Sequence, residues 1–157
     1  HYDITLNPRD YRHNDFSKTL AVQIDLYSRK YQIALIGSYY SYESDCAILK
    51  DDTLTILQDD MITQINIINA SVIRNVLLDC LGCNFAIYQI KKGYIVYGEI
   101  EITMLNFDFE KQWSFFGRDI FVSISNREAF TINENSISLF DIENNYYEID
   151  FDGKQIV

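Results

Sequence analysis

A weak threefold repeat over the last two thirds of the chain is the feature that most constrains its fold. Each copy contains a short strand-like run, at residues 53–56, 94–97 and 136–139, followed by a polar turn and a second strand-like run. The central residues Leu54, Ile95 and Ile137 are 41 and 42 positions apart, a spacing typical of four-stranded β repeats. One such unit cannot bury its apolar face alone, so the sequence predicts several units packed on one another.

The strand-like runs and turns also predict how the rest of the chain is organised. An irregular arm is expected at 1–17 and a β-hairpin at 18–37, where apolar residues alternate with polar ones at the period of a strand with one buried face. The repeat units are expected at 46–78, 85–115 and 129–157, with Asp, Asn and Gly in most of their turns. One stretch, 70–81, fits a helix as well as a strand.

The composition supports an all-β fold. The 157 residues include 12 Tyr and 10 Phe, residue types that favour pleated, half-buried surfaces. We therefore predict a single all-β domain of antiparallel meanders, in about three propeller-like repeats plus the N-terminal hairpin. The repeats would form an open or partial propeller, or a sandwich, because a closed ring usually needs four or more blades.

The net charge limits the partners that the chain can have. With 23 acidic and 13 basic residues the net charge is −10, which repels phosphate groups and makes nucleic acid and anionic membranes improbable partners. A basic protein would be attracted, although an acidic surface also simply keeps a Tyr-rich β protein soluble. Open sheet edges would also allow a homo-oligomer.

The cysteines and histidines predict neither a metal site nor a cofactor. Cys46, Cys80 and Cys83 are an odd and small number of cysteines, which favours a reduced, cytoplasmic location over a disulfide framework. Zinc needs four ligands, and the other candidates, His1 and His13, are scattered. No apolar run approaches the ~18 residues of a membrane helix, and no signal-peptide pattern is present.

A group of charged residues in the second repeat is the strongest candidate for chemistry. Glu99 and Glu101 are two positions apart on a predicted strand, so their side chains would share one face. Asp119 and Arg118 are expected to come near through the turn after Trp113. Two carboxylates on one face with a Trp and an Arg beside them are the groups that a glycosidase or a cation site would need. The same alternation also fits a strand with Ile100 and Ile102 in the core and the acids in water.

Arg118 and Asp119 are unusual because large apolar runs flank them on both sides. A charge in such surroundings needs a partner, and a bidentate contact of Arg118 with Glu99 or Glu101 would supply one. The sequence leaves open whether this is a structural clamp or a catalytic pair. Tyr39 and Tyr40, with further tyrosines at 42, 94, 97, 146 and 147, are candidates for an aromatic binding surface, although strands simply favour Tyr.

The ends of the three repeats, at 65–69, 105–113 and 149–156, share a strand, an Asp- or Asn-containing turn and a second strand. This pattern resembles the repeats of pyrroloquinoline-quinone-type and WD-like β-propellers, and Trp113 stands where the repeat-ending Trp of that family would be. The other two copies have Ile73 and Ile156 there. Segments 98–103, 113–122 and 147–154 are also similar to small uncharacterised bacterial all-β proteins. These resemblances imply the fold and no quinone site or activity.

From these observations we expect a non-enzymatic binding module that engages another protein through an acidic, Tyr-rich surface. The candidate binding residues are Glu99, Glu101, Trp113, Arg118, Asp119, Tyr39 and Tyr40. One alternative is a carbohydrate-binding or glycoside-hydrolysing protein that uses Glu99, Glu101 and Asp119. Another is a toxin-neutralising protein of the immunity type, for which acidity assists binding to a basic partner.

Overall fold

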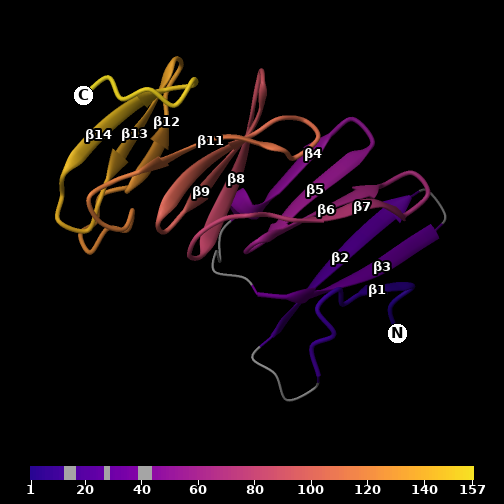
Figure 1. Ribbon diagram of the computed structural model, residues 1–157. Coiled ribbons are helices and arrows are strands. Elements are labelled where there is room, and N and C mark those ends of the chain that lie inside the picture. The colour runs from indigo at the N-terminus through magenta and orange to yellow at the C-terminus, as the bar shows by residue number, and fades with distance from the viewer. Residues whose placement is uncertain (13–16, 27–28, 39–43) are drawn as a thin grey trace. The chain divides into compact units, whose positions relative to one another are not determined.

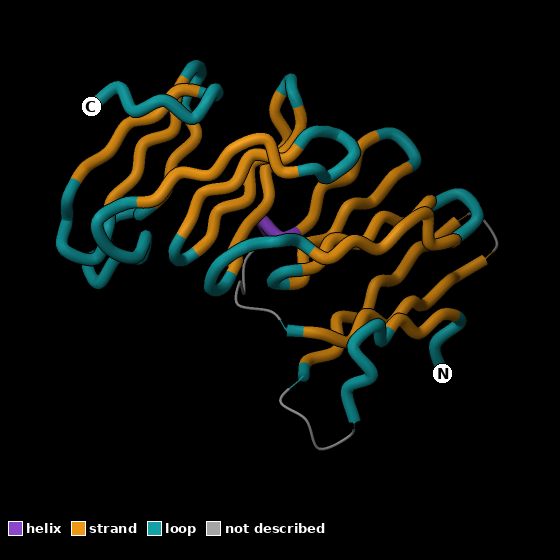
Figure 2. Tube along the Cα trace, viewed as in Figure 1, coloured by secondary structure: helices purple, strands orange, loops and turns teal. Residues whose placement is uncertain are grey.

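The computed structural model describes residues 1–12, 17–26, 29–38 and 44–157. It divides into two compact units, His1–Leu77 and Leu78–Val157. Because the positions of the parts relative to one another are not determined, each unit is described by itself, and the single domain of the sequence analysis stays a prediction. The all-β prediction is confirmed: the described residues form fourteen strands, one short 3-10 turn and no α-helix (Figures 1 and 2).

The first sheet of unit 1 contains the predicted hairpin. Strands β2 (Lys18–Leu26) and β3 (Arg29–Gly37) pair antiparallel along their whole length, from Lys18 opposite Gly37 to Leu26 opposite Arg29. Strand β1 (Ile4–Leu6) pairs in parallel with the other side of β3, so the sheet order is β1-β3-β2. Part of the arm expected to be irregular is therefore a strand, because Ile4 and Leu6 pack against the apolar core of this unit.

The second sheet of unit 1 is the first repeat. It is a meander of β4 (Ala47–Lys50), β5 (Thr53–Gln58), β6 (Met61–Asn66) and β7 (Ser71–Leu77), in that order, after the 3-10 turn Ser44–Cys46. Its core residues Ile56 and Ile65 pack with Ile33 and Leu35 of the hairpin sheet. Segment 70–81 is thus a strand rather than a helix for seven of its residues. Side-chain exposure alternates along this strand, and its residues Val72, Ile73 and Val76 are of the β-branched type that suits a sheet.

Unit 2 contains the second and third repeats, again as two open sheets (Figure 1). The second repeat is the meander β8 (Asn84–Ile90), β9 (Gly93–Gly98), β10 (Glu101–Leu105) and β11 (Lys111–Phe116). The third is β12 (Phe130–Ile132), β13 (Ser136–Phe140) and β14 (Tyr146–Asp150), with a single further bridge from Ile149 to Gln155. The shared core of these two sheets includes Ile95, Ile102, Ile137 and Ile149.

The strand pairing places the central residues of the three repeats at corresponding positions. Leu54, Ile95 and Ile137 each lie on the second strand of a meander and have an apolar residue opposite them on both neighbouring strands. The spacing of 41 and 42 positions between these residues is therefore the length of one antiparallel meander with its connection to the next.

The turns at the ends of the repeats are equivalent as well. Asn106 Oδ1 accepts hydrogen bonds from the backbone N–H groups two and four residues later, and Asp150 Oδ1 does the same. The residue three positions on has a positive φ in both turns, 64° at Phe109 and 78° at Gly153. Asn66 closes a longer version of the turn in the first repeat. An Asx side chain that bonds its own backbone stabilises a reversal of this kind.

Among the described residues, no helix has the length and hydropathy needed to cross a bilayer. No group of three or more potential metal-ligating side chains is found in the same part of the chain.

Candidate binding surfaces of the second unit

Glu101, a predicted site residue, lies at the start of β10 with its side chain only 1% exposed. Its Oε1 accepts a hydrogen bond from the backbone N–H of Leu81 at 2.5 Å. Lys111 Nζ of β11 lies 3.3 Å from Oε2 and 3.5 Å from Oε1. The carboxylate therefore ties the segment before β8 and the start of β11 to β10, and a ligand in solvent cannot reach it.

The expectation that Glu99 and Glu101 share one strand face is wrong. Strand β9 ends at Gly98, and Glu99 lies with Ile100 in the bend before β10. The bend needs glycine, because a Cβ on Gly98 would lie 2.7 Å from the carbonyl oxygen of Glu101. Ile100 is consequently 38% exposed, whereas Ile102 is fully buried.

The predicted clamp between Arg118 and Glu101 is also wrong, because Lys111 is the cation beside Glu101. Arg118 contributes its backbone instead: its N–H donates to the Tyr147 hydroxyl at 2.9 Å, and its side chain is exposed. Asp119 is exposed too, and its Oδ1 accepts from the N–H of Ile120 at 2.7 Å. These two charges avoid burial because they lie in a loop between β11 and β12.

Trp113 lies in β11 and packs on the last turn of the third repeat. Its Nε1–H donates to the carbonyl oxygen of Phe151 at 3.3 Å. A Cβ on Gly153 would lie 2.7 Å from Trp113 Cδ2, so only glycine lets this turn approach the ring so closely. At least part of the indole is therefore engaged within the fold rather than presented as a platform.

Several of the candidate tyrosines are engaged in the core of the second unit. Tyr94 and Tyr147 are each 7% exposed. Tyr97 stacks on Phe130 and donates its hydroxyl hydrogen to the Phe121 carbonyl at 2.6 Å, and burial raises the pKa of Tyr97 to about 12. Tyr146 is 40% exposed. The other candidates in this group, Tyr39, Tyr40 and Tyr42, lie outside the described residues.

Asp141 is a buried carboxylate that the sequence analysis missed. It is 1% exposed and accepts hydrogen bonds from the Tyr147 hydroxyl at 2.8 Å, from the Asn145 side chain at 2.9 Å and from the N–H groups of Glu143 and Asn145. Burial alone would raise its pKa, but these hydrogen bonds outweigh burial and lower it. The available signal was a sequence pattern, because residues 141–144 resemble the turn residues 106–109 and 150–153: each run begins with Asp or Asn, followed by an apolar residue and an acidic one. In the structure Asn144 has the same positive φ, 64°, as Phe109.

The outer face of the third repeat carries a second group of polar and aromatic side chains. Tyr146 and Glu148 of β14 lie on this face, opposite Phe140 and Ser138 of β13. The inner face of the same strands carries buried apolar residues such as Ile137 and Ile149. Hydroxyl groups and the Glu148 carboxylate are linked by hydrogen bonds across this outer face.

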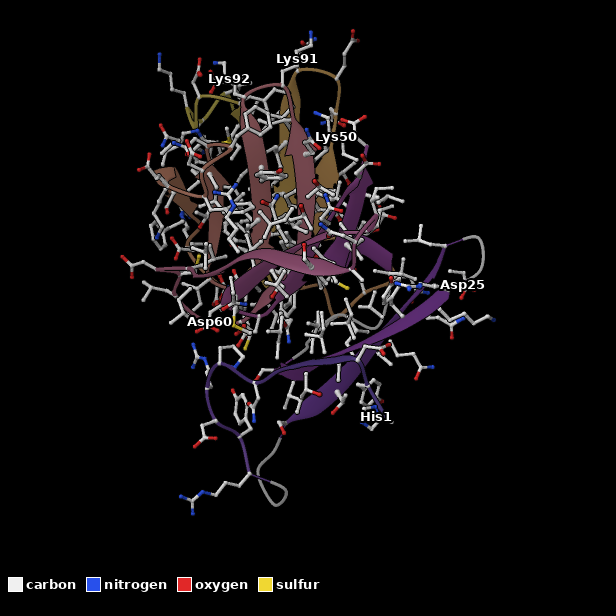
Figure 3. All side chains as sticks on the ribbon, turned by 90° about the vertical axis from the view of Figure 1, so that its right-hand side faces the viewer. His1, Asp25, Lys50, Asp60, Lys91 and Lys92 are labelled. Atoms are coloured by element: carbon white, nitrogen blue, oxygen red, sulfur yellow. The ribbon has the colours of Figure 1, made fainter. Side chains whose placement is uncertain are left out.

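The negative charge of the chain is concentrated in the second unit. It contains 13 acidic and 6 basic residues, a net charge of −7, against 10 and 7 in the first unit, a net charge of −3. Lys91 and Lys92 project from the β8–β9 turn (Figure 3), and Lys92 Nζ contacts Asp152 Oδ1 at 2.6 Å. Lys111 forms an ion pair with Glu101. A basic partner would therefore meet mainly uncompensated acidic groups on this unit.

The three cysteines are unbridged. Cys80 Sγ lies 3.8 Å from the hydroxyl of Thr103, and burial raises the pKa of Cys80. A raised pKa keeps the thiol protonated near neutral pH, so Cys80 is a poor nucleophile.

The role assigned to Glu101 predicts a moderate loss of stability on neutralising it. Glu101→Gln keeps the size and an acceptor for the Leu81 N–H but removes the ion pair, and we expect the second unit to lose about 1–3 kcal/mol of unfolding free energy. Urea denaturation followed by Trp113 fluorescence measures this. Lys111→Gln, at the more exposed end of the pair, is expected to cost less, and equal losses for the two variants would contradict the assignment.

Comparison of the sequence with protein-family models and with curated proteins found no match.

Proposed function

We propose that this chain is a non-enzymatic binding module that engages a basic protein through the acidic surface of its second unit. The observation that carries the proposal is the net charge of −7 on residues 78–157. Such a field speeds diffusional encounter with a basic protein and disfavours acidic ones. Toxin neutralisation is one form that this function can take.

Exposed apolar residues near Glu101 support a protein partner. Leu81, Ile100 and Phe116 are 58%, 38% and 50% exposed. They are neighbours: the Leu81 N–H donates to Glu101, Phe116 pairs with Glu101 across the sheet, and the side chain of Ile100 lies against Gly82. Burial of these apolar side chains against a partner would stabilise the complex, in addition to the electrostatic attraction from the acidic groups of the same unit.

The residues first considered for glycan chemistry do not form a catalytic site. The Glu101 carboxylate is buried and paired with Lys111, and Trp113 packs on the turn around Gly153. These contacts give no support to a glycosidase that uses Glu101, so we do not propose that activity.

We also infer that the three meanders are blade-like repeats of a propeller-like architecture. The equivalent turns at Asn106 and Asp150, with a longer version at Asn66, support this inference. A cytoplasmic location and assembly of copies through sheet edges stay predictions.

Charge-neutralising variants test the proposed function with hexalysine as a model basic ligand. The second-unit variant carries Asp79→Asn, Glu134→Gln and Glu143→Gln at exposed positions. Its control carries Asp10→Asn, Asp51→Asn and Asp52→Asn in the first unit, where Asn tolerates the positive φ of Asp10 and Asp51.

Isothermal titration of the full chain is expected to give binding that weakens as salt approaches ~0.15 M. The second-unit variant should lose about tenfold in affinity, because each removed acid weakens the local field, and the control should lose much less. The proposal fails if neither hexalysine nor hexa-arginine binds at low ionic strength, or if both variants lose affinity equally.

A further inference from the structure

We propose that the outer face of the third repeat binds an arginine side chain of the partner, with Glu148 as the anion and Tyr146 as the aromatic surface. This inference rests on the proposed function, because it takes the partner to be basic. It names the group that is recognised and the residues that recognise it. Tyr146 is already among the aromatic candidates that the sequence offers, whereas Glu148 is not among the predicted site residues.

Glu148 is a carboxylate held in place with acceptor capacity to spare. The Ser136 hydroxyl donates to Oε1 at 2.7 Å, and the Tyr146 hydroxyl donates to Oε2 at 3.2 Å. A carboxylate has about four lone-pair sites, so each oxygen can accept another hydrogen bond. In the part of the chain that the structure describes, no lysine or arginine pairs with Glu148. The group is therefore a partly buried negative charge without a cation.

The neighbours of Glu148 restrict its rotamers. Asn133 Nδ2 donates to the hydroxyl oxygens of Ser138 at 2.8 Å and Ser136 at 3.2 Å, and Ser138 Oγ lies 3.3 Å from the Tyr146 hydroxyl. These contacts connect five side chains from β13, β14 and the turn before β13. A carboxylate already oriented by such a network loses little conformational freedom when a ligand binds.

The aromatic part of the same face already holds a guanidinium group. Arg127 Cζ lies 4.4 Å from the centroid of the Phe140 ring, within the range of a cation–π contact. Phe140 in turn contacts Tyr146, with ring centroids 5.1 Å apart and a tilt of 46°. Because the Tyr146 hydroxyl is bonded to Glu148 while the side chain is 40% exposed, a second guanidinium can meet both the ring and the carboxylate.

The chemistry favours arginine over lysine and over a sugar. A planar guanidinium presents two parallel N–H groups to the two oxygens of a carboxylate and stacks on an aromatic ring, whereas an ammonium is a compact, strongly hydrated point charge. A neutral sugar would gain nothing from the net charge of −7 on this unit. The acidic field and the unpaired carboxylate are complementary to a cation.

The test is an NMR titration of the full chain with hexa-arginine, hexalysine and maltohexaose. Hexa-arginine is expected to shift the amide resonances of Tyr146, Glu148 and Ser138 most and to bind more tightly than hexalysine. Glu148→Gln, which keeps the size of the side chain, should weaken hexa-arginine binding about tenfold, since charge-assisted hydrogen bonds are lost. Tyr146→Leu should weaken it about threefold.

The matched control is Glu134→Gln, which removes the same charge from an exposed position in the same repeat and should weaken binding much less. Equal losses for Glu148→Gln and Glu134→Gln would overturn the inference and leave the proposed function standing, because the field alone would then explain binding. Absence of binding by both peptides at low ionic strength would defeat the proposed function itself.

Shifts of Tyr146 and Glu148 with maltohexaose but not with the peptides would make this face a glycan site and overturn the inference. If Glu148→Gln fails to fold, the hexa-arginine titration of the unmodified chain still tests the inference. The largest amide chemical-shift changes must then occur at Tyr146 and Glu148. If the largest changes occur at other acidic turns, the inference is contradicted.

Discussion

Replacing Phe121 by alanine is expected to lower the unfolding free energy of the second unit by about 3–5 kcal/mol. Phe121 lies in the segment between β11 and β12, outside any strand, yet its side chain is fully buried. Its ring contacts Phe115 and Tyr147, with centroids 6.1 and 6.0 Å away. Its backbone is held as well, since its N–H donates to the Glu99 carbonyl and its carbonyl accepts from Tyr97. Alanine would leave a cavity at the centre of these contacts.

Trp113 fluorescence measures this loss, because the chain contains a single Trp and it belongs to the second unit. Phe116→Ala serves as the control: its side chain is 50% exposed, and we expect a loss of less than about 1 kcal/mol. Similar losses for the two variants would show that the segment before β12 does not anchor the core in the way described.

Replacing Asp141 by alanine is expected to cost about 3 kcal/mol, because the Tyr147 hydroxyl and two backbone N–H groups would lose their acceptor inside the protein. The matched control is Asp150→Ala. Asp150 accepts the same two backbone hydrogen bonds in the same kind of turn but has no buried Tyr beneath it, and we expect a loss of about 1 kcal/mol. The difference between the two losses of unfolding free energy measures the buried hydrogen bonds of Asp141. Equal losses for the two variants would contradict this account.

Asp141 also predicts how stability depends on pH. The pKa of Asp141 is lower in the folded state, since hydrogen bonds to the carboxylate outweigh its burial. Its contribution to stability is therefore fully present above the ordinary Asp pKa of about 3.9 and is lost as the pH falls through the lower value of the folded protein. Urea midpoints measured by Trp113 fluorescence should fall below about pH 4, and less steeply in Asp141→Ala. An unchanged slope in that variant would exclude Asp141 as the cause.

The repeat positions could be predicted from the sequence, whereas the surroundings of the acidic residues could not. Leu54, Ile95 and Ile137 proved equivalent because the period of a meander is set by local strand and turn lengths. The Glu99–Glu101 prediction failed because alternation alone does not reveal where a strand ends, and a glycine at 98 permits a tight reversal. The role of Asp141 depends on Tyr147 and Asn145, and no spacing rule identified that group in advance.

Alternation of apolar residues and the placement of Asp, Asn and Gly were enough to predict most of the strands, most of the turns and the threefold repeat, because these are short-range properties of the chain. The pairing of Glu101 with Lys111, the packing of Trp113 on the Gly153 turn and the unpaired Glu148 beside Tyr146 became visible only in the folded structure. Each depends on which strands become neighbours and how closely their side chains approach, and packing of the whole unit sets those distances.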